Sequence, residues 1–119
     1  MKKSVVLGVL AVVLVVAIGC AVLYVIDGTN VRKSHTHDYL TSTRGYSESE
    51  ISRIQVKHSF FNRVLGYSEW AILVEFEDEP GIKYEYSFNS KLITVSQTGF
   101  TGGSGDKDEL VDSLKHLER

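Results

Sequence analysis

Residues 4–26 read SVVLGVLAVVLVVAIGCAVLYVI, a run of 23 residues without a single Asp, Glu, Lys, Arg or His. A helix rises about 1.5 Å per residue, so this run covers roughly 34 Å, enough to cross a hydrocarbon core of about 30 Å. Lys2, Lys3 and the terminal amine precede it, and Arg32 and Lys33 follow it. The run predicts an N-terminal transmembrane anchor over residues 1–26, and the charges slightly favour an N-terminus in the cytoplasm.

Two cleaved forms of this segment are alternatives to the uncleaved anchor. A secretory signal peptide has an apolar core of about 7–15 residues, and this run is longer. Residues 17–20 (AIGC) have the small-residue-then-cysteine form of a lipoprotein signal, in which Cys20 would be lipidated. Six apolar residues follow Cys20 where a polar tether is normal. The sequence therefore favours an uncleaved helix in which Cys20 is a small apolar side chain.

The 93 residues after the anchor suffice for one small domain. They carry 11 basic and 15 acidic side chains, so their net charge is 11 − 15 = −4. This acidic balance argues against nucleic acid as a partner. The single cysteine lies inside the anchor, so the domain forms no internal disulfide and depends on a conventional hydrophobic core.

Residues 27–50 predict a turn, a helix and a second short turn. The turn is predicted at residues 27–30 (DGTN), whose polar side chains can cap a helix. A helix over residues 31–44 then ends at Gly45, because glycine accepts the positive φ of a helix C-cap. Residues 47–50 (SESE) have the spacing of a capping box, which predicts one short helical turn.

Alternation of apolar and polar residues predicts four strands after this turn. The apolar positions are Ile54, Val56, His58 and Phe60, then Trp70, Ile72, Val74 and Phe76, then Tyr84, Tyr86 and Phe88, with a fourth strand over residues 92–97. Successive strands joined by short loops pair most simply as an antiparallel meander. The helix around Tyr39 and Leu40 is expected to cover its apolar face, so the predicted fold class is α+β.

The C-terminal region predicts a linker and an amphipathic helix. Residues 98–105 contain four glycines, which is typical of a flexible linker. Leu110, Leu114 and Leu117 then fall on one helical face, which we expect to dock on the domain. The predicted organisation is an anchor (1–26), an extracytoplasmic α+β domain (27–97), and a Gly-rich linker with a C-terminal helix (98–119).

Residue patterns for catalysis or metal binding are weak. His35 and His37 could ligate zinc or copper, but polar residues are expected directly after an anchor, so no metal site is predicted. Glu75, Glu77 and Glu79 recur at every second residue, which predicts a solvated strand face rather than paired catalytic carboxylates. The sequence holds no phosphate loop, dinucleotide fingerprint or nucleophile motif, so we expect no cofactor and no enzymatic activity. A small hydrolase that uses Glu75 and Glu77, or a metal on the histidines, is the alternative.

The connection from residue 60 to residue 67 is unusually apolar for a link between two strands. Its apolar residues are Phe60, Phe61, Val64, Leu65 and Tyr67. A connection of this kind usually folds over the edge of the core. If it is exposed instead, it marks a contact with protein or membrane, and it is the first choice for a contact surface.

Four sequence blocks follow one another in this chain: GYSESEI (45–51), VKHSF (56–60), LGYSEW (65–70) and VEFEDEP (74–80). They resemble the domain of unknown function 3139 family, whose members are small proteins of Gram-positive bacteria with an N-terminal hydrophobic segment. The resemblance implies one envelope-associated domain that faces outward. It implies no activity, ligand or catalytic residue.

These observations predict a single-pass membrane protein with its N-terminus inside and its domain outside the cell membrane. The expected function is a non-catalytic binding or regulatory module of the cell envelope. Its expected partners are the membrane and another envelope protein. A lipoprotein or immunity-type protein is a further alternative.

Overall fold

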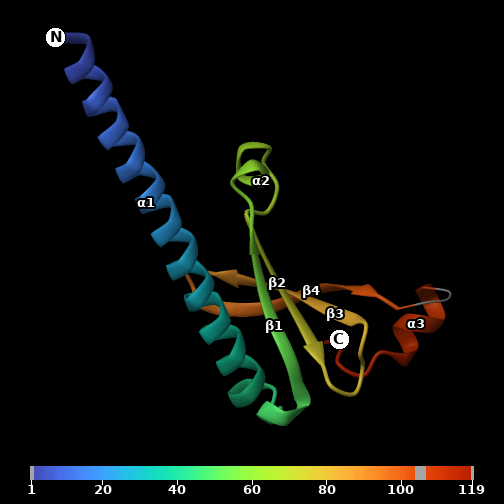
Figure 1. Ribbon diagram of the computed structural model, residues 1–119. Helices are drawn as coiled ribbons and strands as arrows, with labels where there is room; N and C mark the ends of the chain where they lie inside the picture. The colour runs from blue at the N-terminus through green and yellow to red at the C-terminus, as the bar shows by residue number, and fades with distance from the viewer. Residues whose placement is uncertain (1, 104–106, 119) are drawn as a thin grey trace.

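The computed structural model describes residues 2–103 and 107–118. Its strands pair antiparallel in the order β1-β2-β3-β4: β1 (Ile51–His58), β2 (Trp70–Phe76), β3 (Ile82–Asn89) and β4 (Thr94–Gly102). The helical elements are α1 (Lys2–Asp38), its π-helical continuation η1 (Tyr39–Thr43), the 3-10 turn η2 (Glu48–Glu50), α2 (Phe60–Val64) and α3 (Lys107–Ser113). The predicted α+β class, with a four-stranded antiparallel meander, is confirmed (Figure 1).

The first helix is much longer than the predicted anchor. Lys2–Thr43 forms one helix that is long and apolar enough to cross a membrane, because its most apolar window has a mean hydropathy of 3.1 and none of that window is buried. The predicted turn at residues 27–30 is wrong, since α1 runs through it without interruption. The predicted helix over residues 31–44 is therefore the lower part of the anchor helix itself.

The C-terminal part of α1 packs on the sheet through one face of the helix, and the residues of this face are four positions apart. The residues of this face are Tyr24, Gly28, Arg32, Thr36 and Leu40. Positions four apart lie above one another on a helix, so they form a continuous stripe. Thr36 and Leu40 are fully buried, and the Arg32 guanidinium lies 3.9 Å from the centre of the Trp70 ring. This stripe fixes the direction of the anchor relative to the domain.

Gly28 belongs to this stripe because the Trp70 side chain packs directly on its backbone. A β-carbon at position 28 would lie 2.5 Å and 2.6 Å from two ring carbons of Trp70. Glycine is normally unfavourable inside a helix, but it permits such a close approach. The residue that suggested a turn in the sequence is therefore a contact point between helix and sheet.

The end of the helix follows the prediction more closely. Gly45 has φ +77, so it accepts the left-handed conformation expected after a helix end. The short turn predicted at residues 47–50 is present as η2, but the Ser47 side chain makes no capping hydrogen bond to it. Its hydroxyl lies 3.0 Å from that of Ser49 instead.

The hydrophobic core lies on one face of the sheet. Both α1 with η1 and the C-terminal segment pack on this face. Its buried residues are Leu40, Ile72, Val74, Phe76, Tyr84, Tyr86 and Leu114. On this face the alternation predicted for β2 and β3 places Ile72, Val74, Phe76, Tyr84 and Tyr86 in the core, while Trp70 and Phe88 are half-buried. On the opposite face Arg53, Lys57 and Ala71 are exposed, but Leu73 is only 9% exposed.

Two boundaries of the predicted strands differ from the structure. Phe60 is not the end of β1 but the first residue of α2. The fourth strand begins at Thr94, because Leu92 and Ile93 are exposed in the turn before it and Ile93 has φ +52.

The predicted glycine-rich linker is wrong for residues 98–102, which belong to β4. Phe100 pairs with Tyr84, and Gly102 pairs with Ile82. A β-carbon on Gly102 would lie 2.1 Å from the Gly81 carbonyl oxygen, so glycine is needed where the two chains approach closely. Residues 104–105 of that linker lie outside the described residues. Docking of the C-terminal segment is confirmed, although α3 ends at Ser113 and Leu114 and Leu117 follow it.

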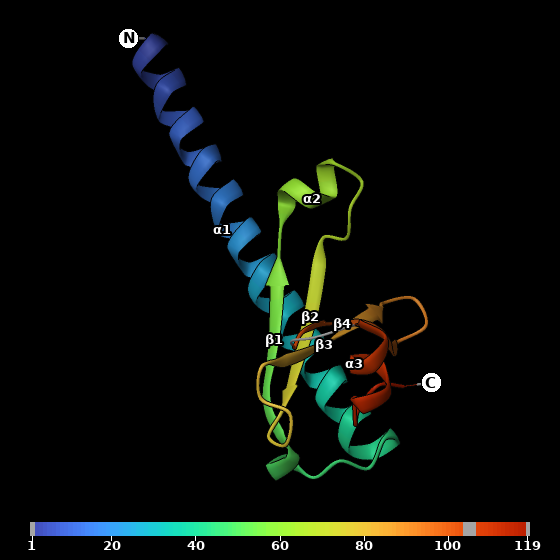
Figure 2. The same ribbon diagram turned by 90° about the vertical axis from the view of Figure 1, so that its right-hand side faces the viewer.

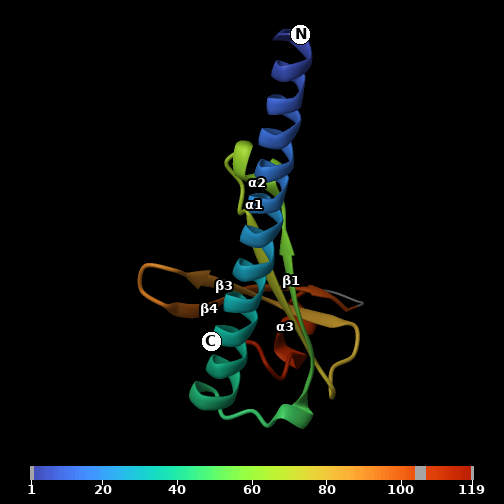
Figure 3. The same ribbon diagram turned by 60° about the vertical axis from the view of Figure 1, so that its left-hand side comes forward.

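The β1–β2 hairpin extends along α1 beyond the body of the sheet. In Figures 1 and 2, α2 stands at the end of this hairpin, at the height of the N-terminal, blue part of α1, which slants away from it. Figure 3 shows that the β3–β4 turn points sideways, away from this direction. Among the described residues, those of α1 and of the β1–β2 hairpin alone therefore form this end of the molecule.

Candidate functional site

The hairpin tip, defined as residues 60–67, is an exposed apolar structure. The Ser59 hydroxyl accepts a hydrogen bond from the Asn62 N–H at 3.2 Å and so caps α2. Gly66, with φ +80, turns the chain back towards β2. The five predicted contact residues, Phe60, Phe61, Val64, Leu65 and Tyr67, are between 46% and 83% exposed. The tip therefore does not fold over the edge of the core.

The polar groups of the hairpin tip bond to one another. The amide N–H groups of Leu65, Gly66 and Tyr67 donate to the carbonyl oxygens of Phe61, Arg63 and Asn62 at 3.1, 3.3 and 2.8 Å. The Asn62 side-chain amide donates to the Ser68 carbonyl oxygen at 3.3 Å. The outer surface of the tip carries its five apolar side chains and that of Arg63, which is 67% exposed, while these polar groups are satisfied within it.

Glu69 ties the base of the tip to α1. Its carboxylate accepts a hydrogen bond from the Tyr24 hydroxyl at 2.8 Å, and it lies 3.4 Å from Arg63 and 3.5 Å from the His58 imidazole. The hydrogen bond from Tyr24 is the main cause that holds the pKa of Glu69 below its usual range. The side chain of Glu69 is only 13% exposed. The Tyr24 hydroxyl, Arg63 and His58 surround its carboxylate and take the place of water.

An aromatic cluster surrounds this carboxylate. The Tyr24 ring lies 5.8 Å from His58, 5.9 Å from Trp70 and 6.2 Å from Phe60, measured between ring centres. These distances are typical of interacting aromatic pairs. The helix, the end of β1 and the start of β2 therefore meet at Tyr24.

The two histidines that suggested a metal point in different directions. Residues two apart on a helix do not face each other. The His35 ring stacks on Phe88 with 4.9 Å between ring centres, whereas His37 lies 3.3 Å from the Glu48 carboxylate. They pack on different neighbours, and no metal site is built from them.

The three glutamates predicted to share a solvated face do not behave alike. Glu77 is exposed, and Glu75 accepts a hydrogen bond from the Gly81 N–H at 3.1 Å. Glu79 is only 9% exposed, because β2 ends at Phe76 and the strand alternation does not continue to residue 79. The prediction of a solvated face is therefore wrong for Glu79.

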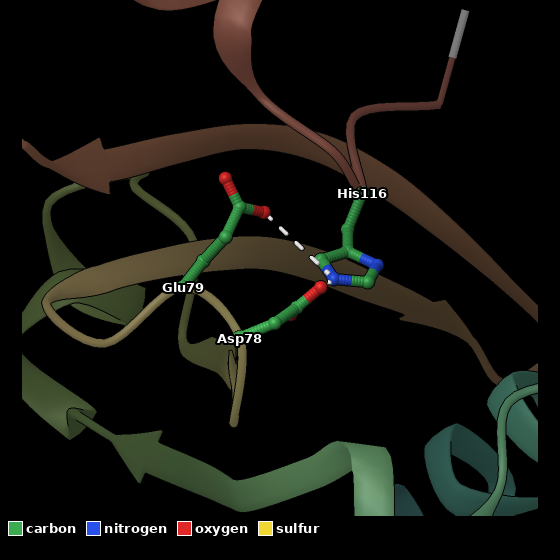
Figure 4. A group of neighbouring side chains, drawn as sticks. All are labelled: Asp78, Glu79 and His116. Carbon is green, nitrogen blue, oxygen red and sulfur yellow. Dashed lines mark hydrogen bonds and ion pairs between the residues drawn. The ribbon is translucent and has the colours of Figure 1, made fainter.

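Glu79 belongs to a cluster with Asp78 and His116, which sequence analysis did not find (Figure 4). It is the one group of three metal-ligand side chains that the described residues bring together, with ligand atoms within 4.8 Å of one another. The His116 Nε2 lies 2.7 Å from the Asp78 carboxylate and 3.8 Å from that of Glu79. Asp78 and His116 are 38 positions apart in the sequence, so no local spacing could have indicated the cluster.

The cluster is used to attach the C-terminal segment to the core. The Glu79 carboxylate accepts a hydrogen bond from the Tyr84 hydroxyl at 2.6 Å and from the Lys115 N–H at 3.3 Å. The His116 ring stacks on Phe76 with 3.8 Å between ring centres. Burial is the main cause that raises the pKa of Tyr84, and the hydrogen bond to Glu79 adds to it. These bonds occupy the atoms that a cation would need, so the arrangement is that of a structural network.

Acid should weaken one contact of this network. The hydrogen bond with His116 is the main cause that holds the pKa of Asp78 below its ordinary value of 3.8. A depressed folded-state pKa stabilises the fold above the unfolded-state pKa, and this contribution is lost as the pH falls through the folded value. Because the Asp78 side chain is 48% exposed, we expect Asp78→Asn to cost under about 1 kcal/mol at neutral pH. Urea unfolding at a series of pH values should show the difference from the parent chain begin to shrink below the ordinary aspartate pKa of about 3.9 and vanish once the pH is below the depressed pKa of the folded chain.

Comparisons of the chain with models of known protein families, with curated proteins and with solved structures find no match. The resemblance to the domain of unknown function 3139 family therefore stays a prediction from the sequence blocks. The function has to be argued from the anchor helix, the hairpin tip and the way the polar groups are used.

Proposed function

We propose that this chain is a single-pass membrane protein whose α+β domain lies outside the cytoplasm and binds or regulates another component of the cell envelope without catalysis. The observation that carries this proposal is the continuity of α1. The helix that is apolar enough to cross a membrane continues without a break into the stripe that packs on the sheet. The domain is thus held at the membrane surface in a fixed orientation.

The charges at the two ends of the apolar run support an N-terminus in the cytoplasm. Lys2, Lys3 and the terminal amine lie before the run. Of the two basic residues after it, Arg32 is part of the fold, since its guanidinium packs on Trp70. The positive-inside tendency then favours an outward-facing domain.

The use of the polar side chains supports a binding role. Glu69 and Glu79 hold structural hydrogen bonds, and Glu75 caps a turn. What is left for contact is the apolar hairpin tip at one end and the uncovered face of the sheet, where Arg53, Lys57 and Ala71 are exposed. The exposed basic side chains of this face suit a polar interface with a protein partner.

The orientation can be tested with protease added to intact cells from which the wall has been removed. We expect digestion of the domain without lysis, and a mass for the intact membrane protein that still includes Lys2 and Lys3. Protection of the domain would reverse the orientation. A mass that begins at a lipidated Cys20 would establish the lipoprotein alternative instead.

The same cells can test the binding role. A photo-crosslinking residue at Lys57, on the uncovered face, should capture a discrete envelope protein, whereas one at Val12, inside the apolar run, should not capture it. Equal capture from both positions would mean that the membrane brings the two proteins together and that the face is not an interface.

A further inference from the structure

The hairpin tip lies at the level of the apolar part of α1. Figures 1, 2 and 3 are turned about one vertical axis, and in each of them α2 stands at the height of the blue part of α1, beyond the body of the sheet. The aromatic contacts of Tyr24 with His58 and Phe60 mark where the hairpin leaves the helix face. Residues 61–67 therefore follow this contact, at the end of the hairpin that points away from the body of the sheet.

The length of the apolar run places Tyr24 at the membrane surface. A hydrocarbon core of about 30 Å takes about 20 residues of helix. Counted from Ser4, directly after Lys3, these residues end at Leu23, because 23 − 4 + 1 = 20. Tyr24 is the next residue, and tyrosine is enriched at this level of a membrane protein. A tip that begins at Tyr24 and extends away from the body of the sheet points towards the lipid.

We propose that the hairpin tip inserts into the outer leaflet of the same bilayer that α1 crosses, so that the domain holds the membrane at two points. This inference rests on the proposed membrane anchor. The inserted side chains are Phe61, Val64, Leu65 and Tyr67. The lipid acyl chains are the occupant of this surface.

The chemistry of the tip fits lipid. A backbone that enters lipid must satisfy its polar groups internally, and the N–H groups of residues 65–67 do so within the tip. Its basic side chain, Arg63, is 67% exposed and lies 3.4 Å from Glu69, so it can extend along the tip towards the headgroups. The acidic side chain, Glu69, stays at the level of Tyr24.

Continuity with α1 favours lipid over a protein partner. The side chains of α1 before Tyr24, such as Val15, Ile18 and Val22, are 49% to 69% exposed. The exposed apolar surfaces of α1 and of the tip lie at the same end of the molecule, so one layer of acyl chains would cover both. The turn of residues 89–93 also exposes Leu92 (71%) and Ile93 (63%), but it points away from this end. It provides a matched apolar position outside the proposed lipid zone.

The test uses the full chain with Cys20→Ala, which removes the only cysteine, reconstituted in phosphatidylcholine vesicles. Single cysteines are introduced as Val64→Cys in the tip, Leu92→Cys as the apolar control and Val12→Cys in the anchor, and each is labelled with an environment-sensitive fluorophore. Positions 12, 64 and 92 are all well exposed in the fold, so the labels displace no core side chain. Iodide in the water and spin-labelled lipid in the bilayer serve as quenchers.

We expect the label at position 64 to emit at shorter wavelength than the label at position 92, to be quenched by spin-labelled lipid and to be protected from iodide. Quenching of label 64 by iodide alone, with label 12 quenched by lipid, would overturn the tip proposal and leave the anchor intact. Protection of label 64 from both quenchers would also overturn it, since protein would then cover the tip. Access of iodide to label 12 would refute the anchor itself.

Discussion

Replacing Trp70 with alanine is expected to lower the free energy of unfolding by about 3–5 kcal/mol, the range for truncating a large aromatic residue at a packed site. Trp70 fills the contact between helix and sheet: its ring packs on Gly28, lies 3.9 Å from the Arg32 guanidinium and 4.4 Å from the centre of the His58 ring. Its removal leaves a gap where α1 joins the domain. Trp70 is the only tryptophan, so urea unfolding of the full chain in micelles should be followed by circular dichroism.

The control for this variant is Glu77→Ala. Glu77 is exposed, and a surface substitution away from special features stays within about 0.5 kcal/mol. Equal losses from the two variants would mean that Trp70 does not fasten the helix to the sheet.

Gly28→Ala gives a second readout of the same contact. In an open helix, alanine is more favourable than glycine by about 1 kcal/mol. Here the new β-carbon would lie 2.5 Å from a carbon of the Trp70 ring, so we expect destabilisation in place of the usual gain. An increase in stability would show that Trp70 can move aside and that the contact is loose.

The same glycine explains the main error of sequence-based prediction in this chain. Residues 27–30 have a turn-like composition, and composition cannot distinguish a helix break from a place where another side chain needs room. The spacing of Tyr24, Gly28, Arg32, Thr36 and Leu40 was a usable signal. It was missed because the stripe begins inside the apolar run, which was treated as a separate anchor.

The strands were predictable where one face is buried and the other is solvated. Ile72, Val74 and Phe76 are three positions of this alternation, and the structure places all three in the core. Leu73, between two of them, is also buried although the alternation predicts a solvated position. The prediction of a flexible linker failed at residues 98–102. Glycine is needed there because β4 passes close to the Gly81 carbonyl, and it does not mark a flexible segment. Glycine content alone did not separate the two roles.

The two candidate sites differ in how far they could be predicted. The apolar residues of the hairpin tip are visible in the sequence, but their exposure depends on how α1 and the β1–β2 hairpin diverge, which no local pattern encodes. The Asp78–Glu79–His116 cluster depends on a contact between residues far apart in the chain. Only its buried position in three dimensions separates Glu79 from Glu77.

The difference in burial between Glu79 and Glu77 predicts the second large change in stability. Glu79→Ala is expected to lower the free energy of unfolding by about 3 kcal/mol, because removing one partner of a buried, charged hydrogen-bond network leaves the others unpaired. The groups left behind are the Tyr84 hydroxyl, the Lys115 N–H and the His116 imidazole. Urea unfolding gives the overall loss, and amide hydrogen exchange should show faster exchange at residues 114–118.

Glu77→Ala is the matched control, since it removes the same side chain two residues away from an exposed position. It should change neither the unfolding free energy by more than about 0.5 kcal/mol nor the exchange of the C-terminal segment. If Glu79→Ala behaved in the same way, the Glu79 carboxylate would be solvated as the strand alternation alone predicted. Faster exchange at the C-terminal segment without a global loss would instead show that the network only fastens this segment, and that the sheet and α1 are stable without it.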